Sequence, residues 1–162
     1  MLIRELIQKD FPEVKAIYDA GIRTGNATFE LNAPDWPAWQ SKFIPQMSFV
    51  AERDGVVLGW GALSQVSTRR VYVGVCEVSI YVDEGFRGDG VGSKLLHHLI
   101  VCSEQNDIWT LQAGVFPENL ASIYLHKKFA FREVGYREKI GKLHGVWRNT
   151  LLFERRSKNV GV

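Results

Sequence analysis

A glycine-rich segment with one arginine is the first place in this sequence where chemistry is expected. Positions 85–94 read Gly-Phe-Arg-Gly-Asp-Gly-Val-Gly-Ser-Lys and stand between a run of β-branched residues and an amphipathic stretch. A strand-to-helix junction of this kind presents unpaired backbone N–H groups and the positive end of the helix dipole. The glycines let the backbone approach a phosphate closely, and Arg87 adds a positive charge. The segment therefore predicts a phosphate-binding loop.

Two common nucleotide-binding motifs do not match this segment. The dinucleotide-binding pattern GxGxxG would need glycine at position 93 or 95, where Ser93 and Leu95 stand. The Walker pattern fails because no Gly-Lys-Ser/Thr follows a glycine at the required spacing. A dinucleotide-dependent oxidoreductase is accordingly the weakest of the functions considered.

Glu77, in the apolar run before the glycines, is a candidate general base. It lies between Cys76 and Val78, and the period of two in a strand places Ser79 and Tyr81 on its face. A carboxylate in this position can accept a proton directly or through a water molecule. The alternative is a structural glutamate paired with Arg69 or another cation, since ion-pair networks use the same residue type.

The elements that position these groups follow from hydrophobic periodicity and turn signals. Strands are expected at Leu2–Leu6, Phe49–Arg53, Val56–Leu63, Val71–Val82, Thr110–Val115, Phe131–Tyr136 and Val146–Glu154. Helices are expected from Phe11 to Ile22, around Trp36–Ile44, from Val91 to Cys102 and from Asn119 to Lys128, with loops at 25–30 and hairpin turns at Asp54-Gly55 and 142–145. An antiparallel meander followed by alternating strands and helices is typical of a mixed α/β sheet.

Length and composition describe one ordinary globular domain. The 162 residues suit a single domain, here residues 1–154, with a short polar tail at 155–162 that is expected to fray. A net charge of +2 does not point to nucleic acid, and no segment reads as a signal peptide or a membrane span. Cys76 and Cys102 lie in apolar runs and are expected to be buried, reduced thiols of a cytoplasmic protein. No metal site is expected, because the adjacent His97 and His98 cannot converge on one ion.

Several segments together resemble the GNAT superfamily of acyl-CoA-dependent N-acyltransferases. The loop Arg87-x-x-Gly90-x-Gly92 is similar to the pyrophosphate loop of that superfamily, and the segment Asn119-x-x-Ser122-x-x-Leu125-His126 resembles its pantetheine-binding helix. Other segments resemble the phosphinothricin or methionine sulfoximine acetyltransferase branch: Thr28-Phe29-Glu30, Arg69 with Tyr72, Glu77-x-Ser79-Ile80-Tyr81-Val82 and His144-Gly145-x-Trp147. The resemblance runs from about Ile3 to Phe153. It implies the GNAT fold, a central, mostly antiparallel, twisted sheet flanked by helices.

The resemblance also implies a cosubstrate, acetyl-CoA, and a set of residues that bind it. These are Ile80, Tyr81, Val82, Arg87, Gly88, Asp89, Gly90, Val91, Gly92, Ser93 and Asn119. In the superfamily, backbone N–H groups near the end of the strand that includes positions 80–82 bind the pantetheine arm and stabilise the oxyanion. No side chain is required for that task.

Glu77 coincides with the glutamate that serves as general base in the branch, and His126 stands where many members have a tyrosine that protonates the leaving thiolate. Tyr124 is the alternative acid. Two residues on a helix are about 200° apart, so only one of them can face the thiol. A dedicated acid is also dispensable if the thiolate is stable enough near neutral pH.

The resemblance assigns the acceptor amine a second set of residues, which are Phe29, Arg69, Tyr72, Glu77, Ser79 and His144. Arg69 or Arg70 would bind a carboxylate, and aromatic side chains, with Trp36 and Trp147 as further candidates, would form an apolar wall. His144 stands in a hairpin turn, where it is either idle or directed at the substrate.

The function expected from these residues is transfer of an acetyl group from acetyl-CoA to the α-amino group of a small amino acid or analogue. Direct attack in a ternary complex and a homodimer are implied by the resemblance. Acetylation of protein or peptide N-termini and a non-catalytic coenzyme-A-binding sensor are the alternatives.

The sequence departs from the usual family pattern at two positions. Ala130 precedes Phe131 where glycine is usual, so the turn does not use a left-handed glycine, and Val75 replaces a common threonine two residues before Glu77.

Overall fold

Seven strands form one sheet in the order β1-β2-β3-β4-β5-β7-β6 in a computed structural model that describes residues 1–162. Every neighbouring pair is antiparallel except β4 and β5, which are parallel. The strands are β1 (Leu2–Glu5), β2 (Ser48–Arg53), β3 (Val56–Gln65), β4 (Val75–Val82), β5 (Thr110–Val115), β6 (Arg132–Leu143) and β7 (Val146–Arg156). The expectation of a mixed α/β, mostly antiparallel sheet is confirmed.

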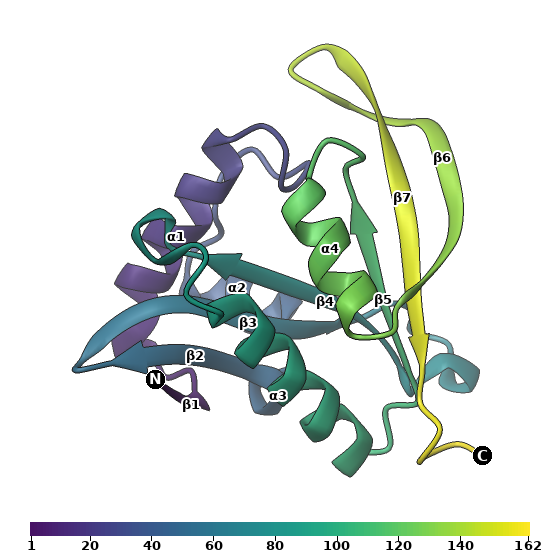
Figure 1. Ribbon diagram of the computed structural model, residues 1–162, viewed down its shortest axis with the longest axis horizontal. Coiled ribbons are helices and arrows are strands. Elements are labelled where there is room, and N and C mark those ends of the chain that lie inside the picture. The colour runs from purple at the N-terminus through teal and green to yellow at the C-terminus, as the bar shows by residue number, and fades with distance from the viewer.

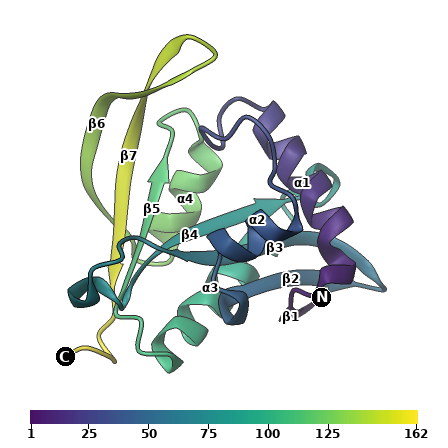
Figure 2. The same ribbon diagram turned by 180° about the vertical axis from the view of Figure 1, so that it is seen from behind.

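Four helices cover the two faces of the sheet: α1 (Phe11–Arg23), α2 (Trp36–Lys42), α3 (Val91–Gln105) and α4 (Leu120–Lys128). Figures 1 and 2 show α3 and α4 on one side and α2 on the other. Each face has its own core. Leu95 and Leu99 of α3 belong to the larger one, whereas Val14 of α1 and Trp39 of α2 pack with Trp60 in the other. Cys76 lies in the larger core, where burial raises the pKa of its thiol to about 11.

β4 is shorter than the sequence predicts. The expected strand Val71–Val82 begins only at Val75, and Arg70–Tyr72 form a turn of 3₁₀ helix instead. The ring of Trp109 lies against Gly74, where an added Cβ would come within 2.2 Å of it. The O atom of Gly74 accepts hydrogen bonds from the N–H groups of Trp109 and Thr110. The parallel pairing with β5 thus starts at this point, and the β-branched residues before it stay outside the sheet.

β6 and β7 form a long hairpin that rises beyond the rest of the sheet (Figure 1). The expected strand Phe131–Tyr136 extends to Leu143, because the turn at His144-Gly145 is a two-residue turn with positive φ at both positions. The register shifts between Arg137 and Gly141, and the N–H of Lys139 donates to Oδ1 of Asn149 at 2.7 Å. With this bulge, β6 continues beyond Tyr136, where the sequence pattern predicts that the strand ends.

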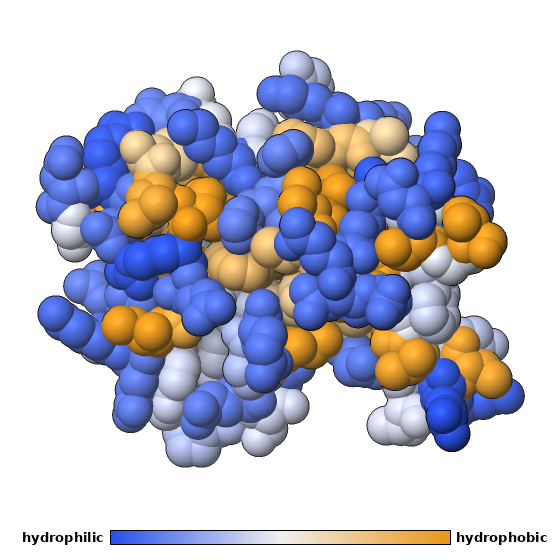
Figure 3. All heavy atoms as spheres, turned by 90° about the horizontal axis from the view of Figure 1, so that it is seen from below, coloured by the Kyte–Doolittle hydropathy of each residue, from blue (hydrophilic) through white to orange (hydrophobic).

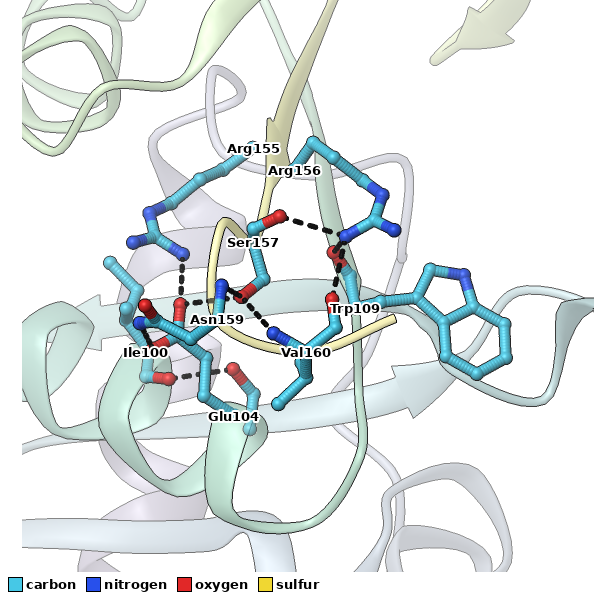
Figure 4. Close-up of polar contacts among 9 residues, drawn as sticks. Ile100, Glu104, Trp109, Arg155, Arg156, Ser157, Asn159 and Val160 are labelled. Carbon is cyan, nitrogen blue, oxygen red and sulfur yellow. Dashed lines mark hydrogen bonds and ion pairs between the residues drawn. The ribbon is translucent and has the colours of Figure 1, made fainter. Parts of the chain in front are cut away.

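The C-terminal residues pack against α3 rather than fray from Arg155. Glu104 of α3 accepts hydrogen bonds from Arg155 at 3.0 Å, from Ser157 at 3.0 Å and from Asn159 at 2.7 Å (Figure 4). The guanidinium of Arg156 donates to main-chain oxygens, among them that of Trp109. The bonds from Asn159, Arg155 and Ser157 lower the pKa of the Glu104 carboxyl. β7 therefore continues to Arg156, and the last residues wrap around its end.

The surface opposite the hairpin tip carries apolar side chains only in separate patches, with hydrophilic side chains between them (Figure 3). None of the helices combines the length and apolar character needed to span a membrane. Large exposed apolar residues also stand on the β6–β7 hairpin and at positions 71–73.

Candidate functional site

β4 and β5 pair over only three residues and then separate. The paired positions end at Glu77 and Gln112, although β4 continues to Val82. The N–H of Val66 donates to the O atom of Val75, so the odd-numbered residues of β4 bond to β3. The N–H and C=O groups of Ile80 and Val82, beyond the last paired position, consequently point toward the gap beside β5 without strand partners there.

This separation opens into a cleft of about 1190 Å³. It is lined by residues of α1, β4, the glycine loop, β5, α4 and β6, and by the segment between α1 and α2. The cleft brings together most of the residues singled out in the sequence: Phe29, Glu77, Ser79, Ile80, Tyr81, Val82, Arg87, Gly88, Gly90, Val91, Gly92, Ser93, Asn119 and His126.

The glycine loop has the conformation that an anion site requires. Gly88 has φ 90° and Gly90 has φ 78°, which an L side chain adopts only at a cost. Gly90 is also the N-cap of α3, and its O atom accepts the first intrahelical bond, from the N–H of Lys94 at 3.1 Å. The N–H groups of Val91, Gly92 and Ser93 precede that bond and are free to bind an anion.

A second cation reaches the start of α3 from the neighbouring helix. Nζ of Lys128, in the last turn of α4, lies 3.4 Å from Oγ of Ser93 and lines the cleft. Nothing in the sequence pattern indicated this residue, because the contact depends on how α4 packs beside α3.

Asp89 is the one predicted loop residue that does not line the cleft. Its carboxylate lies 3.5 Å from the guanidinium of Arg53.

Glu77, Ser79 and Tyr81 line the cleft from one face of β4, as the period of two predicts. Nε2 of Gln112 donates to Oε2 of Glu77 at 3.3 Å, and no cation lies within ion-pair distance of the Glu77 carboxylate. The side chain of Tyr81 stacks on Trp60 with ring centroids 4.7 Å apart, and burial raises the pKa of its hydroxyl. The structure contains no ion pair between Glu77 and Arg69.

His126 is buried, on the side of α4 that faces the core. Its Nδ1 donates to the O atom of Ser122 at 2.8 Å, its ring lies edge-on to Phe131, and Nε2 has no hydrogen-bond partner. Burial lowers the pKa of the imidazole, and the bond to Ser122 opposes that shift only in part. Tyr124 also lines the cleft, but is 71% exposed. The two side chains thus point in different directions, as their spacing predicts.

Asn119 is the N-cap of α4. Its Oδ1 accepts the N–H of Ser122 at 3.1 Å, and its Nδ2 donates to the O atom of Asn26 at 3.2 Å. Both polar atoms of the side chain are therefore engaged, and its place in the cleft is tied to the segment between α1 and α2.

The opposite wall of the cleft contains aromatic and charged side chains. Phe29 packs edge-on against Phe116 at 4.9 Å and lies so close to Gly141 that an added Cβ would be 3.0 Å from its ring. Lys42 bonds Glu30 at 2.8 Å and lies 3.4 Å from the hydroxyl of Tyr18. Burial alone would lower the pKa of Lys42, but Glu30 and Tyr18 together outweigh it and the pKa is raised.

Three residues predicted to contact the acceptor lie outside this cleft. Arg69 stacks on Tyr72, with its guanidinium carbon 5.4 Å from the ring centroid, and neither residue lines the cleft. His144 is exposed at the hairpin turn. The cations that do line the acceptor half, Lys42 and Arg137, were not anticipated. Lys42 reaches the cleft from the end of α2 and Arg137 stands at the bulge in β6, and neither placement has a regular sequence signal.

Comparisons with known proteins agree with this geometry. Residues 3–131 match the model of the acetyltransferase (GNAT) family. The chain is 33% identical to the phosphinothricin N-acetyltransferase of Alcaligenes faecalis, over 94% of this chain and 81% of that protein. It is 26% identical to the L-methionine sulfoximine/L-methionine sulfone acetyltransferase of Pseudomonas aeruginosa, over 90% and 88% of the two chains.

Solved structures show the same fold. A phosphinothricin acetyltransferase from Sinorhizobium meliloti, solved in complex with acetyl-CoA, superposes with a TM-score of 0.90 at 25% identity, covering 99% of this chain and 90% of that one. The ribosomal-protein-alanine N-acetyltransferase of Brucella melitensis superposes with a TM-score of 0.88 at 28% identity, covering 97% and 100%. The splayed strands, the glycine loop at α3 and these matches together identify the chain as a member of the GNAT family of acetyltransferases.

Proposed function

We propose that this enzyme transfers the acetyl group of acetyl-CoA to the α-amino group of a small amino acid or analogue of the methionine sulfoximine, methionine sulfone or phosphinothricin type. One observation carries the proposal: a single cleft joins an anion-binding loop to a carboxylate, Glu77, that has no cationic partner. The names of the relatives from Alcaligenes and Pseudomonas support the substrate class.

The residues present fit the coenzyme. Gly88 and Gly90 leave the loop without side chains at the approach to the free N–H groups of α3, and Arg87 and Lys128 supply positive charge for the phosphates. The open edge of β4 offers the N–H and C=O groups of Ile80 and Val82 to an amide-containing arm. Tyr81, Val91, Gly92 and Ser93 complete the proposed coenzyme site, and Asp89 supports it through Arg53. Bound there, acetyl-CoA would supply the thioester.

Glu77 is the proposed general base. It takes a proton from the acceptor ammonium, directly or through a water molecule, so that the free amine can attack in a ternary complex without a covalent enzyme intermediate. A backbone N–H on the open edge of β4, that of Ile80 or of Val82, stabilises the oxyanion. Phe29 and Ser79 border the proposed amine site.

The resemblance implies that His126 protonates the leaving thiolate, but the surroundings of His126 favour another source of that proton. The single ring proton of neutral His126 is held by the O atom of Ser122, so donation to a thiolate would require the imidazolium that burial disfavours. We infer that His126 acts through its unpartnered Nε2 as a hydrogen-bond acceptor, and that Tyr124 or solvent provides the proton. A thiol titrates near enough to neutral pH for this to suffice.

We further propose that the protein is a homodimer assembled through the β6–β7 hairpin. Five large apolar residues of the hairpin are between 42% and 60% exposed: Val134, Tyr136, Ile140, Val146 and Trp147. Such a density of exposed apolar side chains favours a protein partner. Since Arg69, Tyr72 and His144 lie outside the cleft of their own chain, their proposed contact with the amine depends on a second copy. Light scattering tests this, and Trp147→Lys should shift the mass toward that of one chain.

A reducing, cytoplasmic environment fits the two cysteines, both of which are free thiols. We therefore retain a cytoplasmic location as part of the proposal.

The decisive experiment measures release of the coenzyme A thiol from acetyl-CoA with a panel of free amino acids, methionine sulfoximine, methionine sulfone and phosphinothricin. Turnover of one of these amines is expected, with acetylation at the α-nitrogen confirmed by mass spectrometry. If the protein binds acetyl-CoA tightly and acetylates no amine, the catalytic proposal fails and a sensor role takes its place.

A second candidate acceptor is the N-terminus of a protein or peptide. The match to the Brucella ribosomal-protein-alanine N-acetyltransferase favours it. Peptides with an N-terminal alanine belong in the same panel, and activity on these peptides but not on free amino acids would establish this second function.

A further inference from the structure

Arg148 of β7 joins three segments that are far apart in the sequence. Its Nη1 donates to the O atom of Gly25 at 2.6 Å, and its Nη2 donates to Oδ1 of Asn26 at 2.8 Å. Nη2 also lies 3.3 Å from Oε2 of Glu118, and the guanidinium carbon is 4.2 Å from the centre of the Phe116 ring. The side chain is only 16% exposed. All five donors of a guanidinium lie in one plane, which suits simultaneous bonds of this kind.

Arg148 does not line the cleft, but the residues it binds do. Asn26, Phe116 and Glu118 are all part of the cleft wall. Asn26 in turn accepts, through its O atom, the bond from Asn119 at the start of α4. The arginine thus fastens the segment between α1 and α2 to the segment between β5 and α4, and both segments line the cleft.

The α1–α2 segment has few other attachments near this point. Apart from the bonds to Arg148 and Asn119, the hydrogen bonds of residues 24–27 stay within residues 21–26. Phe29 follows directly and forms part of the wall through its contacts with Phe116 and Gly141. Removing the guanidinium would leave the Gly25 carbonyl and the Asn26 amide oxygen without their partners, so this segment would lose its main link to the body of the fold.

We propose that Arg148 is a positioning residue for the acceptor amine: it holds residues 25–29 in place and, through them, the wall formed by Phe29. The inference rests on the proposed function, in which this wall borders the amine. The coenzyme loop and the first turn of α3, which would bind the phosphates, are held by other residues, so Arg148 is linked to the coenzyme site only indirectly, through the bond between Asn26 and Asn119.

The test compares Arg148→Met with the wild-type enzyme. Methionine retains an unbranched stem against Phe116 and removes every hydrogen bond. The KM for the amine should rise about tenfold, which corresponds to the loss of about one hydrogen bond to a charged group, while the KM for acetyl-CoA stays within about twofold. Arg148→Lys, which retains the charge but only one point of attachment, should recover part of the loss. Arg132→Met is the matched control, because it removes an exposed ion pair with Glu154 on the same hairpin.

A second measurement decides the inference without reference to turnover. Hydrogen–deuterium exchange of residues 24–29 should speed up in Arg148→Met, and exchange at the start of α3 should not change. Unchanged exchange in residues 24–29, or an equal rise in both KM values, overturns the inference. Should the wild-type enzyme acetylate no amine, the proposed function fails on its own account, and the exchange of residues 24–29 then decides whether Arg148 is the attachment described.

Discussion

Glu77 and Gln112 face each other at the last paired position of β4 and β5, and the two strands separate directly beyond them. The amide of Gln112 donates to one carboxylate oxygen of Glu77, and the other oxygen has no protein partner. The candidate base is therefore held by a neutral group at the point where the cleft begins. An amide fixes the orientation of the carboxylate without adding the positive charge that an arginine would.

Replacing Glu77 by glutamine should slow acetyl transfer by about 10²–10⁴-fold, the usual contribution of a general base. Acetyl-CoA affinity should not change, because the phosphate loop lies at the other end of β4. Stopped-assay kinetics and calorimetric titration with acetyl-CoA measure the two quantities. Glu133→Gln, at an exposed position of β6, is the matched control. A Glu77→Gln enzyme with wild-type rates from acid to alkaline pH would remove Glu77 from the mechanism.

Gly90→Ala should weaken both the fold and the coenzyme site. Gly90 has φ 78° at the N-cap of α3, and an alanine there costs about 1–2 kcal/mol of unfolding free energy. Relief of that strain would also move the free N–H groups of the first turn, so acetyl-CoA should bind less tightly. Chemical denaturation and titration provide the two readings. Gly135→Ala, at a position with ordinary φ and open space, should leave both nearly unchanged, and equal effects from the two variants would contradict the argument.

Ala130→Gly should stabilise the protein by about 1 kcal/mol. Ala130 adopts φ 61° after α4, so the chain keeps the left-handed turn although the residue is not glycine. The gain from relieving a left-handed alanine exceeds the entropy that glycine adds to the unfolded chain. The midpoint of urea unfolding measures it. Ala16→Gly, in the middle of α1, should instead destabilise by about 1 kcal/mol.

Stability should fall as the pH drops below about 6.5, the ordinary pKa of histidine. The folded-state pKa of His126 is lowered by burial, so the unfolded chain binds more protons in this range and unfolding is favoured by acid. His98, whose pKa burial also lowers, adds to the slope. Unfolding free energies measured between pH 7.5 and 5.5 should therefore depend less on pH in His126→Gln than in the wild type. An unchanged slope would show that His126 is not neutral in the fold.

The parts of the site formed by contiguous sequence could be predicted. The glycine loop and the face of β4 that carries Glu77 each depend on local spacing or backbone preference, and the structure has them where the pattern predicts. The turn at His144-Gly145, outside the cleft, was predictable for the same reason. The parallel pairing of β4 with β5 was harder to predict from the sequence. It starts where Gly74 packs against Trp109, and these two residues are far apart in the chain.

Residues whose place depends on long-range packing could not be located from the sequence. The resemblance assigns Arg69 to the acceptor amine, and the start of the 3₁₀ turn places it outside the cleft of its own chain. Arg148 and Lys128 gave no signal, because their partners lie up to 123 residues away. His126 was placed on the correct helix, but its protonation depends on burial, which periodicity cannot reveal.

The three paired positions of β4 and β5 also divide the chain into two antiparallel halves: β1–β4, whose strands pair in chain order, and β5–β7, in which β6 and β7 form a hairpin and β7 pairs with β5. During folding, each half can gain structure early, whereas the parallel seam, the pairing of β4 with β5, needs the crossover through α3 and forms late. A molecule that fills the cleft touches both halves. Acetyl-CoA should thus make unfolding more cooperative and protect the amides of the β4–β5 pairing from hydrogen exchange. The cosubstrate would then stabilise the fold in addition to supplying the acetyl group.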